Sequence, residues 1–474
     1  MGTYRGVVML RVLGVVTTAA LLASSGETSR VIGVPSRASE TSAGVSSESA
    51  SGAAKLDVAA LLAAARGAPP MICALAAQSV RNYGWGDRAD APATPLDINA
   101  LLSDGERGSR DLSDADVTRL LDALASDDGC VRELSVRLVG RRDDARVGPA
   151  LISKLAASDA SLRAVAAFGL GLAQPRSAEE PLVRALRDAT PAVRANSAWA
   201  LGRMESGRAL STLVSMFRDE SPMVREAAVA ATGRLDSTSA VAALTRVVQQ
   251  DESASVRRVA AWALGHLEAR ESADALASVL TRDRDAGVRE MAAWALGNFD
   301  QRGTSGALQN ALRSDADDAV RETAAWALAR VDGDNASAAL GTAAQSDRSS
   351  RVRGTAAWAL GQHRGDGRAP AGLLHVLRDD SEDTRLKAAW ALGQIADSAA
   401  LPAIRDALKV EQSSEVRRAL VRALTRSGGH SEAMLSELLS SKDPQVREAA
   451  VRGLAGRSSF NPWPWPWPRP RPFT

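Results

Sequence analysis

Few side chains in this sequence have the types and spacing that metal or acid–base chemistry requires. The chain contains 2 cysteines and 4 histidines, the latter at His266, His363, His375 and His430. A zinc site needs about four Cys or His ligands in closely spaced pairs, so these residues leave little room for one. The sequence also has no Gly-rich phosphate loop and no convincing nucleophile–base set. We therefore expect no catalytic residue, no metal and no cofactor.

Composition favours a large helical protein. The 474 residues are 45% hydrophobic and only 4% aromatic, and they are rich in Ala and Leu, which lose little conformational freedom in helices. The 58 basic and 56 acidic residues leave a net charge of +2. Because a nucleic-acid binder needs a basic face to neutralise phosphates, we expect no nucleic-acid partner. No apolar run reaches the roughly 18–20 residues of a membrane span.

A repeated motif organises the middle of the chain. The string AAWALG, or a close variant, recurs after a Val-Arg pair or its equivalent at intervals of 30 to 32 residues. Each interval holds an apolar stripe at helical spacing, a polar turn and a second helical stretch. In the unit 268–297, the second helix is predicted from Val288 to Leu296, and Gly297 is expected as a left-handed C-cap. Such a unit buries its apolar face only by stacking on its neighbours.

The turn and the arginine of each unit resemble those of a known family. The pattern D-x-x-V-R-x-x-A-A-x-A-L-G is similar to the HEAT-repeat superfamily, specifically its short bacterial, phycobilisome-lyase-type HEAT-like repeat. It is seen around Asp219, Asp317 and Asp443. The resemblance covers roughly residues 115–457 and implies an all-α, right-handed α-solenoid of about eleven helix-turn-helix repeats. It also implies that the turn Asp and the helix Arg form a structural ladder, which we assign to Arg132, Arg163, Arg194, Arg225, Arg257, Arg289, Arg321, Arg353, Arg385, Arg417 and Arg447.

Some HEAT-like proteins are enzymes, but their motifs do not carry over to this chain. Di-iron hydroxylases of this type use His-Glu pairs, whereas the histidines here precede Leu267, Arg364, Val376 and Ser431. HEAT-type DNA glycosylases need a basic inner face, and the repeat match alone does not transfer the bilin attachment of the lyases. We predict a non-catalytic protein–protein interaction scaffold. The alternatives are an enzyme-associated protein of lyase or oxidoreductase type, or an envelope anchor acting through its tail.

A row of aromatic residues suggests where a partner binds. With the marker arginine as position 0 and about 100° per residue, the apolar positions −1, +3, +6 and +7 define the buried face. Position +5 lies about 145° from the centre of that face. In HEAT arrays the second helices line the concave surface, so we expect an exposed row that binds extended polypeptide. The alternative is that each indole lies flat against the neighbouring second helix. The row consists of Phe168, Trp199, Trp262, Trp294, Trp326, Trp358 and Trp390.

Position +1 lies on the same predicted surface and carries both signs of charge. Mixed charge fits a polypeptide partner better than a polyanion, although a solvated face would show the same pattern. The charged residues at this position are Glu226, Arg258, Glu290, Glu322, Arg418 and Glu448.

The tail, residues 458–474, alternates proline with tryptophan and then with arginine. Alternate prolines forbid a helix and favour an extended polyproline II strand. The expected roles are a ligand for the protein's own aromatic row, a membrane-surface anchor, or a disordered terminus. The residues that form this aromatic–cationic ligand are Trp463, Trp465, Trp467, Arg469 and Arg471.

The N-terminal part predicts export. Residues 1–25 have the basic start, short apolar run and small residues of a signal peptide, although an ordinary frayed terminus is the alternative. Residues 26–55 are expected as a flexible linker, and residues 56–114 as an N-terminal helical cap and connector. In an exported, periplasmic or secreted protein Cys73 and Cys130 would form a disulfide; in a cytoplasmic one they would be buried thiols.

Overall fold

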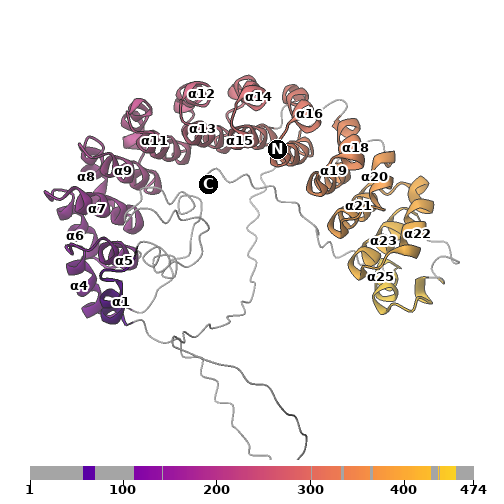
Figure 1. Ribbon diagram of the computed structural model, residues 1–474, viewed down its shortest axis with the longest axis horizontal. Helices are drawn as coiled ribbons and strands as arrows, with labels where there is room; N and C mark the ends of the chain where they lie inside the picture. The colour runs from indigo at the N-terminus through magenta and orange to yellow at the C-terminus, as the bar shows by residue number, and fades with distance from the viewer. Residues whose placement is uncertain are drawn as a thin grey trace, which may run out of the picture. The chain divides into compact units, whose positions relative to one another are not determined.

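The computed structural model describes residues 57–69, 112–140, 142–299, 302–331, 336–362, 367–428, 436 and 438–454. All regular structure in these residues is helical, so the predicted all-α solenoid is confirmed. The signal segment, the linker, Cys73 and the tail with Trp463, Trp465, Trp467, Arg469 and Arg471 lie outside the described residues. The helices form two layers: Figure 1 shows α12, α14 and α16 in one layer and α13 and α15 in the other.

The first helix of each repeat carries a single apolar stripe. In α14, Leu276, Val279 and Leu280 are buried, and they face the second helix of the same repeat. The opposite side of these helices is polar and exposed, as expected for the outer layer of a solenoid. The first helices are α4 (Asp114–Ala123), α6 (Val147–Lys154), α8 (Glu179–Ala185), α10 (Leu210–Ser215), α12 (Val241–Gln250), α14 (Ala273–Arg282), α16 (Ser305–Ser314), α18 (Ala336–Ser346), α20 (Ala371–Val376) and α22 (Leu401–Val410).

The second helices pack on the first helices and on each other. They start at polar N-caps; the Asp285 carboxylate, for example, accepts from the Val288 N–H at 3.0 Å. Their alanines, such as Ala292 and Ala293, are fully buried, which lets neighbouring helices approach closely. These helices are α5 (Gly129–Val139), α7 (Ala160–Ala173), α9 (Pro191–Arg203), α11 (Pro222–Arg234), α13 (Ala254–His266), α15 (Ala286–Gly297), α17 (Asp318–Leu328), α19 (Ser350–Gln362), α21 (Glu382–Ile395), α23 (Ser414–Arg426) and α25 (Pro444–Leu454).

An N-terminal helix, α1 (Val58–Ala65), precedes the repeats. It lies against α4 and α5 and buries Val58 and Leu62. After this helix the backbone N–H of Gly67 donates to the Asp128 carboxylate at 2.7 Å. This contact lowers the pKa of Asp128 and attaches the helix to the first turn of the array.

An ion pair crosses each boundary between neighbouring repeats. In α15, the Arg289 guanidinium donates through Nε and Nη2 to both oxygens of Asp315, at 2.7 and 2.8 Å. Asp315 lies in the turn of the following repeat, and both side chains are largely buried. The same two-nitrogen contact joins Arg163–Asp188, Arg194–Asp219, Arg225–Asp251, Arg257–Asp283, Arg321–Asp347, Arg353–Asp379, Arg385–Glu411 and Arg417–Asp443.

Each arginine also holds the turn of its own repeat. Arg289 Nη1 donates to the carbonyl of Asp283 at 3.0 Å, and the Asp283 carboxylate is bound by Arg257 of the preceding repeat. One turn residue is therefore fixed by two arginines, through its side chain and through its backbone. Its carboxylate also accepts from the backbone N–H two residues later, as Asp315 does from Asp317 at 2.9 Å. The ladder thus runs continuously through the turns.

The sequence motif misplaces one turn residue. Asp317 is not part of the ladder, because Asp315 binds Arg289 instead; Asp317 is the N-cap of α17 and accepts from the Ala319 N–H at 2.9 Å. The first ion pair of the ladder has fewer hydrogen bonds than the others, because Arg132 binds Asp159 through Nη1 only, at 2.9 Å.

Replacing Arg289 by Met should destabilise the protein by about 3–5 kcal/mol, because the largely buried Asp315 carboxylate loses its countercharge. Urea unfolding followed by circular dichroism measures the change. Arg184→Met is the matched control: its pair with Glu180 is exposed, with side-chain exposures of 68% and 83%, and we expect a loss below about 1 kcal/mol. Equal losses for the two variants would contradict a structural role for the ladder.

Candidate protein-binding surface

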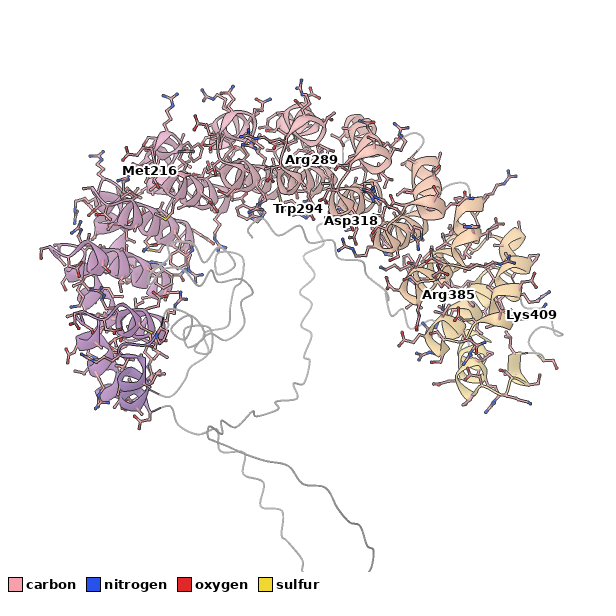
Figure 2. The ribbon with its side chains drawn as sticks, viewed as in Figure 1. Met216, Arg289, Trp294, Asp318, Arg385 and Lys409 are labelled. Carbon is pink, nitrogen blue, oxygen red and sulfur yellow. The ribbon has the colours of Figure 1, made fainter. Side chains whose placement is uncertain are left out.

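The candidate site is the face of the second helices that is turned away from the first helices. It carries positions +1, +5 and +9 relative to each ladder arginine, and we call it the second-helix surface. Figure 2 shows Trp294 and Asp318 on this side of α15 and α17. The predicted aromatic row and the predicted charged row both belong to it.

The aromatic row is more buried than the sequence predicts. Phe168, Trp199, Trp262 and Trp358 are at most 4% exposed, so the expectation of exposure is wrong for them. The indoles of Trp294, Trp326 and Trp390 are half-buried and pack against the core. The helical wheel fails here because it treats each helix as isolated, whereas an indole at position +5 leans over the preceding second helix.

A glycine on that preceding helix receives five of the six indoles, and Ala329 stands at the equivalent position before Trp358. A Cβ atom at Gly171 would lie 2.3 Å from Cζ3 of Trp199, and one at Gly265 would lie 2.7 Å from Cζ3 of Trp294. Contacts this short are forbidden, so only glycine leaves room for the ring. The same contact joins Gly233 to Trp262, Gly297 to Trp326 and Gly361 to Trp390.

These contacts correct the role expected for Gly297. It is the last residue of α15, and it lies against the Trp326 ring, which would be 3.0 Å from an added Cβ. The left-handed conformation is instead adopted by non-glycine residues after other second helices, such as Glu205 and Glu268, with φ of 51° and 48°. The glycine of the AAWALG string therefore serves packing between repeats.

Position +9, which the sequence analysis missed, covers the indoles with polar groups. The Arg203 guanidinium lies 5.4 Å from the Trp199 ring centroid, and its Nε donates to the Gly171 carbonyl at 2.8 Å. Arg330 repeats this arrangement over Trp326, and His266 stacks on Trp262 with ring centroids 5.3 Å apart. The available signal was an Arg or His four residues after the tryptophan.

Two carboxylates of the charged row are largely withdrawn from water. Burial raises the pKa of Glu290 to about 7; the Thr323 hydroxyl, which donates to Oε1 at 3.4 Å, opposes this, and the nearby carboxylates of Asp317 and Glu322 add to it. Burial also raises the pKa of Glu322, whose Oε1 accepts from Thr355 at 3.3 Å. Glu290 is thus poised to gain or lose a proton near neutral pH.

An exposed ion pair lies beside these carboxylates. Arg351 of α19 binds Asp318 of α17 at 2.7 Å, and its Nε lies 3.7 Å from Oε2 of Glu322. The side chains of Arg351 and Asp318 are 61% and 45% exposed, so a ligand on this surface can reach them. Between α15 and α21 the second-helix surface therefore combines half-buried indoles with accessible charges.

Metal binding and membrane insertion find no matching feature in the described residues. No cluster of His, Cys, Asp or Glu among them has the geometry to hold a metal ion, and no described helix is long and apolar enough to cross a membrane. Cys130 is disulfide-bonded. Cys73 is the chain's other cysteine and lies outside the described residues, so the Cys73–Cys130 bridge and export both stay predictions.

The fold and the repeated Arg–carboxylate ladder define an α-solenoid of stacked helix–turn–helix repeats. A family model described as HEAT repeats matches residues 148–231, 212–297, 273–361, 305–383 and 369–455. The chain belongs to the HEAT-repeat family, as its motifs predict. The narrower resemblance to phycobilisome-lyase-type repeats stays a prediction. Among curated proteins, none matches the sequence significantly.

Solved structures share the fold at low identity. Importin beta is 14% identical with a TM-score of 0.56, over 81% of this chain and 58% of that one. Kap95p, described as binding RanGDP, is 13% identical with a TM-score of 0.50, over 84% of this chain and 63% of that one. An engineered protein is 20% identical with a TM-score of 0.38, over 72% and 98% of the two chains. The chain spans less than two thirds of these two importin-type chains, and the likeness to them is one of fold.

Replacing Gly171 by Ala should destabilise the protein by about 1–3 kcal/mol, because the new methyl group collides with the fully buried Trp199 ring. The control is Gly306→Ala in α16, where nothing lies within 4 Å of an added Cβ. That change should be neutral or stabilising by up to about 1 kcal/mol. Thermal unfolding of the two variants measures both effects, and a neutral Gly171→Ala would refute the packing role of the glycine.

Replacing Glu290 by Gln should change how stability depends on pH. Because the folded-state pKa is raised from 4.5 to about 7, the wild type loses stability as pH rises from about 4.5 to 7, and Gln cannot ionise. The variant should therefore gain on the order of 2–3 kcal/mol relative to the wild type between pH 4.5 and pH 8. Urea titrations at the two pH values measure this difference, and a constant difference would show that Glu290 ionises freely.

Proposed function

We propose that the protein is a non-catalytic scaffold that holds an extended polypeptide on the second-helix surface between α15 and α21. One observation carries the proposal: Trp294, Trp326 and Trp390 are only partly buried there, on the same surface as the accessible Asp318 and Arg351. The fully buried members of the aromatic row are assigned to packing and are not part of the proposed site.

The packing of the indoles favours binding. Trp294 and Trp326 are held against Gly265 and Gly297 of the preceding helices, so their ring orientation is fixed before a partner arrives. A rigid aromatic anchor loses little conformational entropy on binding. Tryptophan and arginine are also the residue types most enriched where binding energy concentrates in protein interfaces.

The charges indicate which polypeptides fit best. Glu290, Asp317, Asp318 and Glu322 outnumber the nearby Arg258, Arg351 and Lys387. Carboxylates accept hydrogen bonds from backbone N–H groups and from Lys or Arg side chains. An extended segment with basic and aromatic side chains therefore matches this part of the surface, and an acidic one does not.

The similarity to solved structures supports a scaffold at the level of the fold. Kap95p, a solenoid of similar fold, is described as binding RanGDP in the context of nuclear import complex assembly. A row of stacked repeats offers a long surface to a protein partner, and function is then decided by the side chains on it. For this chain those side chains are the indoles and charges of α15 to α21.

A synthetic extended peptide, (Arg-Pro-Phe-Pro)4, tests the proposal by fluorescence anisotropy. We expect the double variant Asp318→Asn/Glu322→Gln to bind it at least about tenfold more weakly, because two carboxylate charges that attract its guanidinium groups are lost. Glu180→Gln, on the opposite layer in α8, should leave affinity unchanged. The acidic counterpart (Glu-Pro-Phe-Pro)4 should bind the wild type poorly. Equal affinity for both peptides, or no effect of the double variant, would refute the proposed surface.

A further inference from the structure

The last repeat exposes a position that every earlier repeat buries. Position +4 of the second helices faces the following repeat, and in the last one, α25, it is Val451, which is 53% exposed. Figure 1 shows α25 at the end of the described array, beside α23. The ten equivalent residues in the preceding second helices are all 0% exposed: Val136, Ala167, Ala198, Val229, Ala261, Ala293, Ala325, Ala357, Ala389 and Val421.

The two ends of the ladder also differ. At the N-terminal end, the first turn carboxylate, Asp128, is already bound by the Gly67 N–H after α1. At the C-terminal end, Arg447 is exposed, and within the described residues its guanidinium bonds to the Ser441 carbonyl but to no carboxylate. A non-repeat segment therefore covers the N-terminal end of the array. At the C-terminal end, no described residue covers α25 in the same way.

We propose that the whole segment after α25, residues 455–474, which contains the tail 458–474 and is called the tail from here on, folds back over α25 and caps this end of the solenoid. Its tryptophans, Trp463, Trp465 and Trp467, cover Val451, and its backbone carbonyls accept from Arg447. The terminal units of a solenoid need a polar outer face to remain soluble, and a cap over the exposed Val451 would supply one. The N-terminal end uses the same kind of contact. There the backbone N–H of Gly67 donates to Asp128, in the place that a ladder arginine of a preceding repeat would take.

The tail suits this place by position and chemistry. It follows Leu454, the last residue of α25, directly, so its effective concentration at the end face is high. In the extended polyproline II form its 20 residues span about 60 Å. That form has no internal hydrogen bonds, so its carbonyls are available to Arg447. The tail contains no Asp or Glu, so carbonyls are the acceptors it can offer.

A second copy stacked head to tail fits less well. Such a copy would have to offer its first turn carboxylate, Asp128, to Arg447, as each repeat does within the array. The segment after α1 already occupies that carboxylate through Gly67. The covered N-terminal end therefore argues for the protein's own tail as the occupant.

Hydrogen exchange of α25 in the full-length protein tests the cap. We expect Trp463→Ala/Trp465→Ala/Trp467→Ala to accelerate amide exchange in α25 by about tenfold or more, with α7 and α9 unchanged. Val451→Ser should accelerate exchange in the wild-type background but add little in the triple variant, because the contact is already lost. Val410→Ser is the matched control: this valine is 69% exposed at the end of α22, and the change should leave α25 unaffected.

Two results would overturn the cap. Unchanged exchange of α25 in the triple variant would show that the tail does not cover it. Protection that persists in the triple variant but rises with protein concentration would assign the face to a second copy. Neither result bears on the proposed binding surface, which is measured with (Arg-Pro-Phe-Pro)4 at Asp318 and Glu322.

Discussion

A guanidinium–carboxylate pair crosses each boundary from Arg163 to Arg417, and the architecture depends on it. The pair fixes the distance between two consecutive turns, because the planar guanidinium donates to the carboxylate in one geometry. The same arginine binds the carbonyl of its own turn, so each link is rigid with respect to the next. The helices then stack in a constant register, and the second-helix surface follows from that register.

The second constraint is the contact between a tryptophan and the glycine of the preceding repeat. It helps to bury Trp199 and Trp262, against Gly171 and Gly233, on a face that would otherwise be open to solvent. Phe168 and Trp358 are stacked instead on the neighbouring rings of Trp199 and Trp390. It also limits the proposed binding surface, which is reduced to the partly buried rings of Trp294, Trp326 and Trp390 and the charges around Asp318. Packing and the proposed recognition thus use the same row of side chains.

The period of the repeat was sufficient to predict the helices and the arginines, because both depend on spacing along one chain. It was not sufficient to predict how Trp199 or Gly171 is used, since each belongs to a contact between two helices. The turn carboxylate Asp315 was missed for a similar reason, because Asp317, two residues later, fits the motif equally well. Only the structure shows that Asp315 pairs with Arg289 and that Asp317 is the N-cap of α17. The polar cover of Arg203 and Arg330 likewise depends on neighbours.

The glycine–tryptophan contact has a consequence for how such an array changes length. Both residues are present at five boundaries, so removing a whole number of periods between two of them joins a glycine to the tryptophan of a later repeat and recreates the same boundary. Around α11 the match even improves: Gly202 now faces Ala231 where Ala230 replaces the tryptophan, and excision of that period would place it before Trp262. Duplication or loss of whole periods therefore preserves the contact wherever the two joined repeats supply a glycine and a tryptophan.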